Sequence, residues 1–132
     1  MKMSLSIPVN IKIGYCQDST ISSSGDIIFT GKGVYISEIN ANNNILFTDE
    51  KCIVRGGTIK AGNEIRCKIV GSEGGVATKL MVGNEGHIWI DAAYENTILA
   101  VGVREFILDC YSRNVQAYID TDHELIVNRT KQ

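Results

Sequence analysis

The chain has 132 residues, 44% of them hydrophobic and 21% charged, which predicts one folded domain with a buried core. Its formal net charge is −2 at pH 7, whereas nucleic-acid-binding domains usually carry a basic excess, so nucleic acid is excluded as a partner. No apolar run reaches the roughly 18 residues of a membrane span, and the N-terminus lacks the hydrophobic segment of a signal peptide. We therefore expect a cytoplasmic protein without membrane insertion.

The segment 1–14 carries apolar residues at every second position, namely Ile7, Val9, Ile11 and Ile13. Alternation with a period of two predicts a β-strand. We expect this strand to lead into the first repeat and to cap that end of the domain.

The segment 15–104 repeats a nine-residue pattern whose clear copies begin at Ile21, Ile39, Ile59 and Leu80. A weaker fifth copy begins at Ile98, and the fourth copy needs an insertion, which we place at 86–87. Spacings close to 20 residues are typical of proteins whose repeats stack on one another. Glycine-rich corners separate the short alternating segments, so the sequence predicts an all-β fold, a parallel β-solenoid of about five coils in a single domain.

Within each copy, positions 1, 3, 7 and 9 are apolar or small and alternate with polar positions, which predicts that they point into the core. These positions are Ile21, Ile27, Phe29, Ile39, Ala41, Ile45, Phe47, Ile59, Ala61, Ile65, Cys67, Leu80, Val82 and Ile88. Position 5 is glycine or asparagine in every copy, and these residues tolerate a positive φ. We therefore expect a left-handed backbone at Gly25, Asn43, Asn63 and Asn84.

The sequence leaves two alternatives to this fold. A left-handed hexapeptide helix repeats strictly every six residues, whereas the coil length here varies, and this favours a right-handed β-helix. The spacing of Leu99, Val103, Phe106 and Cys110 also fits one face of a helix, which leaves a helical segment open as an alternative.

The C-terminal segment 105–127 predicts a capping hairpin, because two alternating apolar runs, 115–119 and 125–127, flank a polar turn. We expect the tail 128–132 to be frayed. The turn holds Asp120, Asp122 and Glu124, but it lacks the glycine of a calcium loop, so we expect a solvated turn.

The cysteines and glycines predict no cofactor site. Cys16, Cys52, Cys67 and Cys110 form no closely spaced pair that would indicate zinc, and without a secretory signal we expect reduced, mostly buried thiols. The segment 71–79 lacks the adjacent Gly-Lys-Ser/Thr of a phosphate-binding loop.

Two outward columns are candidate sites. Position 8 carries Ile28, Leu46, Arg66 and Trp89, and a mostly apolar outward stripe indicates either a protein interface or a surface covered by the chain's own hairpin. Position 6 carries three acids, of which Glu64 and Glu85 would be paired carboxylates in a catalytic groove.

The stretch 54–83, VRGGTIKAGNEIRCKIVGSEGGVATKLMVG, resembles the β-solenoid segment of the flagellar assembly protein A (FapA) family. The preceding stretch 25–47, GDIIFTGKGVYISEINANNNILF, fits the same pattern, and 97–127 is similar to the hairpin that closes that domain. The resemblance covers about residues 14–127, and bactofilins, which are polymer-forming solenoids, come second.

The resemblance implies a structural role only, because the separate N-terminal domain and long helical segment usual in the family have no counterpart in these residues. We expect a non-catalytic scaffold that binds a protein partner or a second copy of itself, in assembly of a flagellar or cell-envelope structure. The alternative is a glycan-binding or glycan-cleaving β-helix that uses Glu64 and Glu85.

Overall fold

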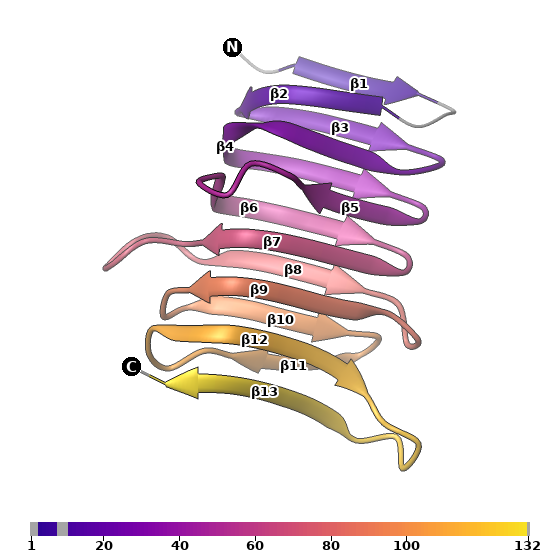
Figure 1. Ribbon diagram of the computed structural model, residues 1–132. Helices are drawn as coiled ribbons and strands as arrows, with labels where there is room; N and C mark the ends of the chain where they lie inside the picture. Colours follow the sequence, from indigo (N-terminus) through magenta and orange to yellow (C-terminus); the bar gives the residue numbers. More distant parts are fainter. Residues whose placement is uncertain (1–2, 8–10, 132) are drawn as a thin grey trace.

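A computed structural model of the chain describes residues 3–7 and 11–131. Its strands are β1 (Met3–Ile7), β2 (Ile11–Gln17), β3 (Ser19–Ser23), β4 (Ile27–Ala41), β5 (Asn44–Phe47), β6 (Ile53–Ala61), β7 (Glu64–Val70), β8 (Thr78–Val82), β9 (His87–Ala93), β10 (Thr97–Val101), β11 (Arg104–Ile107), β12 (Ser112–Ile119) and β13 (Leu125–Lys131). They form one continuous sheet that winds into stacked coils (Figure 1). The described residues contain no helix long and apolar enough to cross a membrane.

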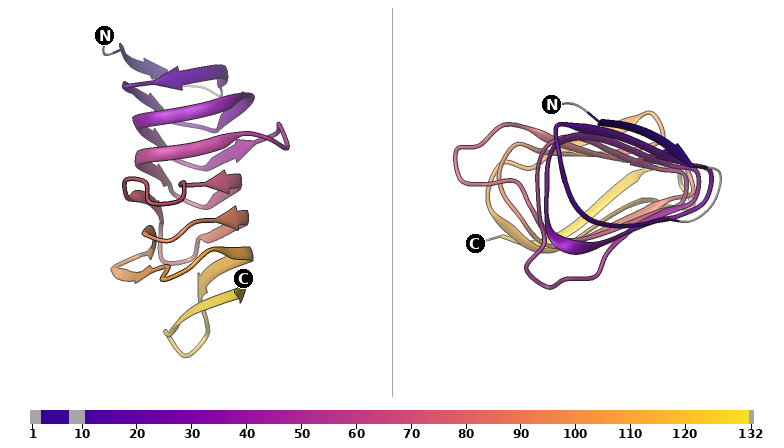
Figure 2. Two further views of the ribbon diagram at one scale, coloured as in Figure 1. Left: turned by 90° about the vertical axis from the view of Figure 1, so that its left-hand side faces the viewer. Right: turned by 90° about the horizontal axis from the view of Figure 1, so that it is seen from above.

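The coils have three faces (Figure 2). The first face stacks β1, β3, the end of β4, the end of β6, β8 and β10 in parallel. The second face stacks the start of β2, the start of β4, β5, the start of β7 and β9. The third face joins them through the end of β2, the middle of β4, the start of β6 and the ends of β7 and β9. The predicted β-solenoid is therefore confirmed.

The sense of winding follows from the direction of the strands. In Figure 1 the nearer strands β5, β7 and β9 run to the left, and the more distant β6 and β8 run to the right, while the chain descends. This is a right-handed coil, the hand that the variable coil length favours.

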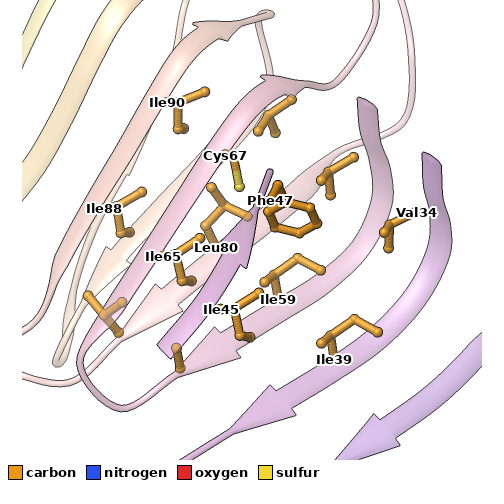
Figure 3. Close-up of a cluster of buried hydrophobic side chains, with 14 of the residues drawn as sticks. Val34, Ile39, Ile45, Phe47, Ile59, Ile65, Cys67, Leu80, Ile88 and Ile90 are labelled. Carbon is orange, nitrogen blue, oxygen red and sulfur yellow. The ribbon is translucent and has the colours of Figure 1, made fainter. Parts of the chain in front are cut away.

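Aliphatic side chains fill the interior in stacked columns (Figure 3). Every residue that the repeat points inward is buried, with an exposed fraction of 5% or less, so the predicted core is confirmed. Ile27, Ile45, Ile65 and Ile88 form one such column because the parallel register places them opposite one another. Phe29 and Phe47 stack with ring centroids 4.8 Å apart.

The expected left-handed corner at Gly25, Asn43, Asn63 and Asn84 is wrong, because none of these residues has a positive φ. Hydrogen bonds between coils hold the backbones of Gly25, Asn43 and Asn63 instead. The backbone N–H of Asn43 donates to the backbone carbonyl of Gly25 at 3.1 Å. The backbone N–H of Asn63 donates to the backbone carbonyl of Asn43 at 2.8 Å. The corner is a stacked ladder with ordinary dihedral angles.

The left-handed backbone lies at a different corner, between the third face and the first. Asp18, Ile36 and Gly56 have φ values of 48°, 49° and 77°. Each precedes the start of a first-face strand, where hydroxyl groups are buried and bonded to the backbone. The hydroxyls of Ser19 and Ser37 donate to the carbonyls of Gln17 and Tyr35, both at 2.9 Å, and that of Thr78 accepts from the amide of Gly56 at 2.8 Å.

The strand register also corrects two details of the repeat. Glu64 lies opposite His87, so the two extra residues of the fourth copy are Asn84 and Glu85, not 86–87. The amide of His87 fixes this register by donating to the carbonyl of Asn63 at 2.8 Å. The fifth copy begins at Leu99, one residue later than expected, because Leu99 lies opposite Leu80.

The two ends of the solenoid differ from the sequence expectation. The coils begin with β1 and β2, which pair with β3 and β4, so a separate lead-in strand over 1–14 is wrong; Val9 lies outside the described residues. At the other end the chain reverses, and β11 pairs with β10 and β12 with β9 in antiparallel fashion. The helical alternative is wrong, because Leu99 lies in β10 and Phe106 in β11.

The C-terminal hairpin is formed by β12 and β13. β13 extends to Lys131, so the expectation of a frayed tail is wrong for 128–131, and Gln132 lies outside the described residues. Arg129 explains this order: its guanidinium bonds the Asp109 carboxylate at 2.9 Å and the Ser112 hydroxyl at 3.3 Å, and it lies 5.2 Å from the ring centre of Phe106. An inward-pointing charge of this kind also blocks further strand pairing at the end of a sheet.

Replacing Ile36 tests the left-handed corner. A β-branched residue with a positive φ is strained, so Ile36→Asn should raise the free energy of unfolding by about 1 kcal/mol, since its side chain is 62% exposed and loses little packing. Chemical denaturation measures the change. Val76→Asn is the matched control, because Val76 is 64% exposed without a positive φ and should show no gain. Equal effects of the two substitutions would contradict the assignment of strain to Ile36.

The ion pair of Arg129 with Asp109 makes the cap sensitive to acid. The hydrogen bond from Arg129 lowers the pKa of Asp109 below its ordinary value of 3.8, so the pair stabilises the fold above that pH and is lost as the pH falls through the lowered pKa. Asp109→Asn should therefore lower Tm at pH 7, and the difference from the wild type should shrink as the pH falls through the lowered pKa of Asp109. Parallel pH profiles of Tm for the two proteins would contradict a role for this carboxylate.

Candidate functional site

The outward stripe of the second face is continuous. Strand pairing places Ile28 beside Leu46, Leu46 beside Arg66, and Arg66 beside Trp89. Each residue lies between two inward neighbours on its strand, so all four side chains project from the same face. The structure thus brings together the four residues that the repeat predicted as a candidate interface.

The stripe has an apolar half and an aromatic half. Ile28 and Leu46 are half-buried by their neighbours in the face. The Arg66 guanidinium lies 4.0 Å from the centre of the Trp89 ring, a cation–π contact that shields the indole while leaving the arginine side chain 54% exposed. Aromatic and arginine side chains of this kind often dominate the energetics of protein interfaces.

The C-terminal hairpin does not cover the stripe. β12 pairs beside β9, which puts Gln116 next to Trp89, and β13 then places Asn128 next to Gln116. The hairpin therefore extends the second face beyond Trp89, as Figure 1 shows, and does not fold back over Ile28 or Leu46.

An aromatic ladder, which the sequence analysis missed, continues from the stripe. The rings of His87 and Trp89 stack with centroids 5.0 Å apart and an interplanar angle of 13°, and those of His87 and Tyr118 stack at 5.1 Å and 21°. Assigning His87 to the insertion hid this contact. Knowing that His87 pairs with Glu64 on the neighbouring strand would have revealed the ladder, but the residue pattern does not encode this pairing.

Charged residues flank the stripe on both sides. On one side, the carboxylate of Glu64 pairs with the side chain of Arg66. On the other side, the Lys68 ammonium lies 3.6 Å from a carboxylate oxygen of Glu50 and 4.0 Å from one of Asp91. Exposed pairs of this kind contribute little to stability, so these charges remain available to a partner at small cost.

Strand pairing does not place Glu64 and Glu85 in one column. Glu64 is in register with Asn44 and His87, while Glu85 belongs to the two-residue insertion and lines a cleft beside the hairpin. The expected column of acids therefore has a histidine at its fourth position. The cleft beside the hairpin is lined by Glu85 and not by Glu64.

The acidic turn of the hairpin is organised by its own backbone. One carboxylate oxygen of Asp120 accepts hydrogen bonds from the amides of Asp122 and Glu124, both at 2.9 Å. His123 completes the turn with a φ of 63°. The Asp120 carboxylate therefore caps the turn, in keeping with the expected solvated loop.

The cysteines are free, and three of them are buried. Burial, followed by the nearby charge of Asp49, raises the pKa of Cys52 to about 11. Burial also raises the pKa of Cys67 well above its ordinary value. Because the thiolate is the reactive form of cysteine, these two thiols are unsuited to nucleophilic chemistry near neutral pH.

Comparison with known proteins assigns the fold to a family. The family model described as Flagellar Assembly Protein A beta solenoid domain matches residues 5–102, well over half of the chain. The match begins within β1 and ends at the turn after β10, so it spans the parallel coils and stops before the antiparallel cap. No curated protein and no solved structure matches the chain. The repeat, the stacked coils and the family model agree, and the chain belongs to the FapA family through its β-solenoid domain.

Proposed function

We propose that this chain is a non-catalytic, cytoplasmic scaffold in the assembly of a flagellar or cell-envelope structure, and that it docks through its second face. The observation that carries this proposal is the stripe formed by Ile28, Leu46, Arg66 and Trp89, whose apolar part projects outward. Stacked coils with a filled core form a rigid support, and a rigid surface loses little conformational entropy on binding.

The partner that fits the stripe is a second copy of the chain. The acid Glu64 and the imidazole His87 lie on one side of the stripe, and Lys68 and Asp91 lie on the other, two residues further along the same strands. A two-fold axis parallel to the stripe places each flank of the stripe in one copy opposite the other flank in the second copy. Glu64 then meets Lys68, and His87 meets Asp91, so the two flanks of the stripe are complementary to each other.

Leu46→Lys tests the docking surface. Burial of a leucine side chain stabilises an interface by roughly 1.5–3 kcal/mol, so the substitution should weaken self-association at least tenfold while the monomer stays folded. Light scattering should give twice the 14.5 kDa chain mass for the wild type and a shift toward monomer for the variant. Thr58→Lys, on the first face, is the matched control and should keep the wild-type mass.

Two further variants show whether the effect is local. Ile45→Ala removes the inward neighbour of Leu46 and should cost about 2–5 kcal/mol in unfolding free energy, which distinguishes core damage from surface damage. Glu64→Lys and Lys68→Glu should each weaken the dimer, and the double variant should restore it, because the charges are exchanged. A wild-type protein that stays monomeric would contradict self-docking.

A further inference from the structure

Three departures from the regular repeat meet at one place. They are the insertion at Asn84 and Glu85, the turn between β10 and β11 with Val103 and Arg104, and the hairpin segment 118–123. Together they line a cleft of about 760 Å³ near the C-terminal end of the solenoid. This volume is typical of sites that bind small molecules. The cleft is separate from the apolar part of the stripe.

The walls of the cleft are held in place before any ligand arrives. Asn84 packs its side-chain oxygen against Gly102, whose φ of 61° favours glycine. The Asp120 carboxylate fixes the hairpin turn through two backbone amides. Tyr118 is held by stacking on His87. A site with fixed walls loses less conformational entropy when a ligand binds.

The chemistry of the lining is mixed. Glu85 supplies a carboxylate and Arg104 supplies a guanidinium. Neither forms an ion pair with any residue in the described part of the chain. Val103, Ile119 and Tyr118 supply an apolar and aromatic wall, and Val103 is 96% exposed, an unusual degree for an aliphatic side chain. The cleft therefore offers hydrogen-bonding groups of both kinds beside an apolar surface.

We propose that this cleft binds a short neutral oligosaccharide. A sugar ring presents C–H groups on its faces, which fit an apolar and aromatic wall, and hydroxyls around its edge, which both donate and accept hydrogen bonds. Asn84, Glu85 and Arg104 carry planar groups that can bond adjacent hydroxyls in pairs. The lining carries two carboxylates, Glu85 and Asp120, and one guanidinium, Arg104, so it has no cationic excess that would favour an anionic ligand over a neutral one. This binding needs no catalytic carboxylate pair and is independent of self-docking through the stripe.

Titration with cellotriose, maltotriose and chitotriose tests the proposal. Trp89 is the sole tryptophan and is joined to Tyr118 through His87, so at least one of these sugars should change its fluorescence and shift the amide resonances of 84–85, 103–104 and 118–123 in a ¹⁵N–¹H spectrum. Tyr118→Ala should weaken that binding at least tenfold. Arg104→Gln, a change at an exposed residue that leaves the fold intact, should weaken it as well.

Tyr15→Ala is the matched control, because Tyr15 is an exposed tyrosine at the other end of the solenoid, and it should bind as the wild type does. The proposal is overturned if none of the three sugars shifts these resonances at concentrations up to about 10 mM, where binding with a millimolar Kd would be detected. It is also overturned if the shifts lie elsewhere, or if trialanine binds the cleft and the sugars do not. Loss of self-association by Leu46→Lys leaves the sugar titration unchanged.

Discussion

The structure depends on the parallel, in-register stacking of one coil on the next. Each strand of the parallel part shares its backbone hydrogen bonds with the coils before and after it, so every inward position must be filled by a side chain that fits directly over its equivalents. Ile27, Ile45, Ile65 and Ile88 satisfy this condition with the same residue four times. Isoleucine suits it because its β-branched side chain has few rotamers and packs well on a pleated surface.

Stacking also decides how the corners are made. Where the first face turns into the second, the coil-to-coil hydrogen bonds of Asn43 and Asn63 leave no need for an unusual dihedral angle. Where the third face turns into the first, the corner is made by residues with a positive φ, namely Asp18, Ile36 and the pair Gly56 and Gly57. The buried hydroxyls of Ser19 and Ser37 donate to the backbone carbonyls of Gln17 and Tyr35, so these hydroxyls are themselves paired within the turn.

These constraints explain which features were predictable from the residues. The inward columns were predicted because alternation with a period of two directly reflects the pleat of a strand. The outward stripe followed from the same alternation, so Leu46 and Trp89 were placed correctly on one face. The positive-φ corner was misplaced because propensity identifies residues that tolerate such a backbone, while Ile36 shows that the stacked coils can impose it on a residue that does not. The register at His87 depends on a hydrogen bond to another coil, which no local pattern encodes.

Two kinds of surface are possible in this fold. A regular coil can present only flat, repeating columns, because each outward side chain has an equivalent directly above and below it; such columns suit contacts with another extended protein surface. A cleft needs chain that leaves the repeat. Here the departures at Asn84, Val103 and Thr121 occur in different coils but face a common space, because the antiparallel cap brings the hairpin back beside the insertion. The cap that closes the sheet is therefore also what creates a concave site on an otherwise uniform molecule.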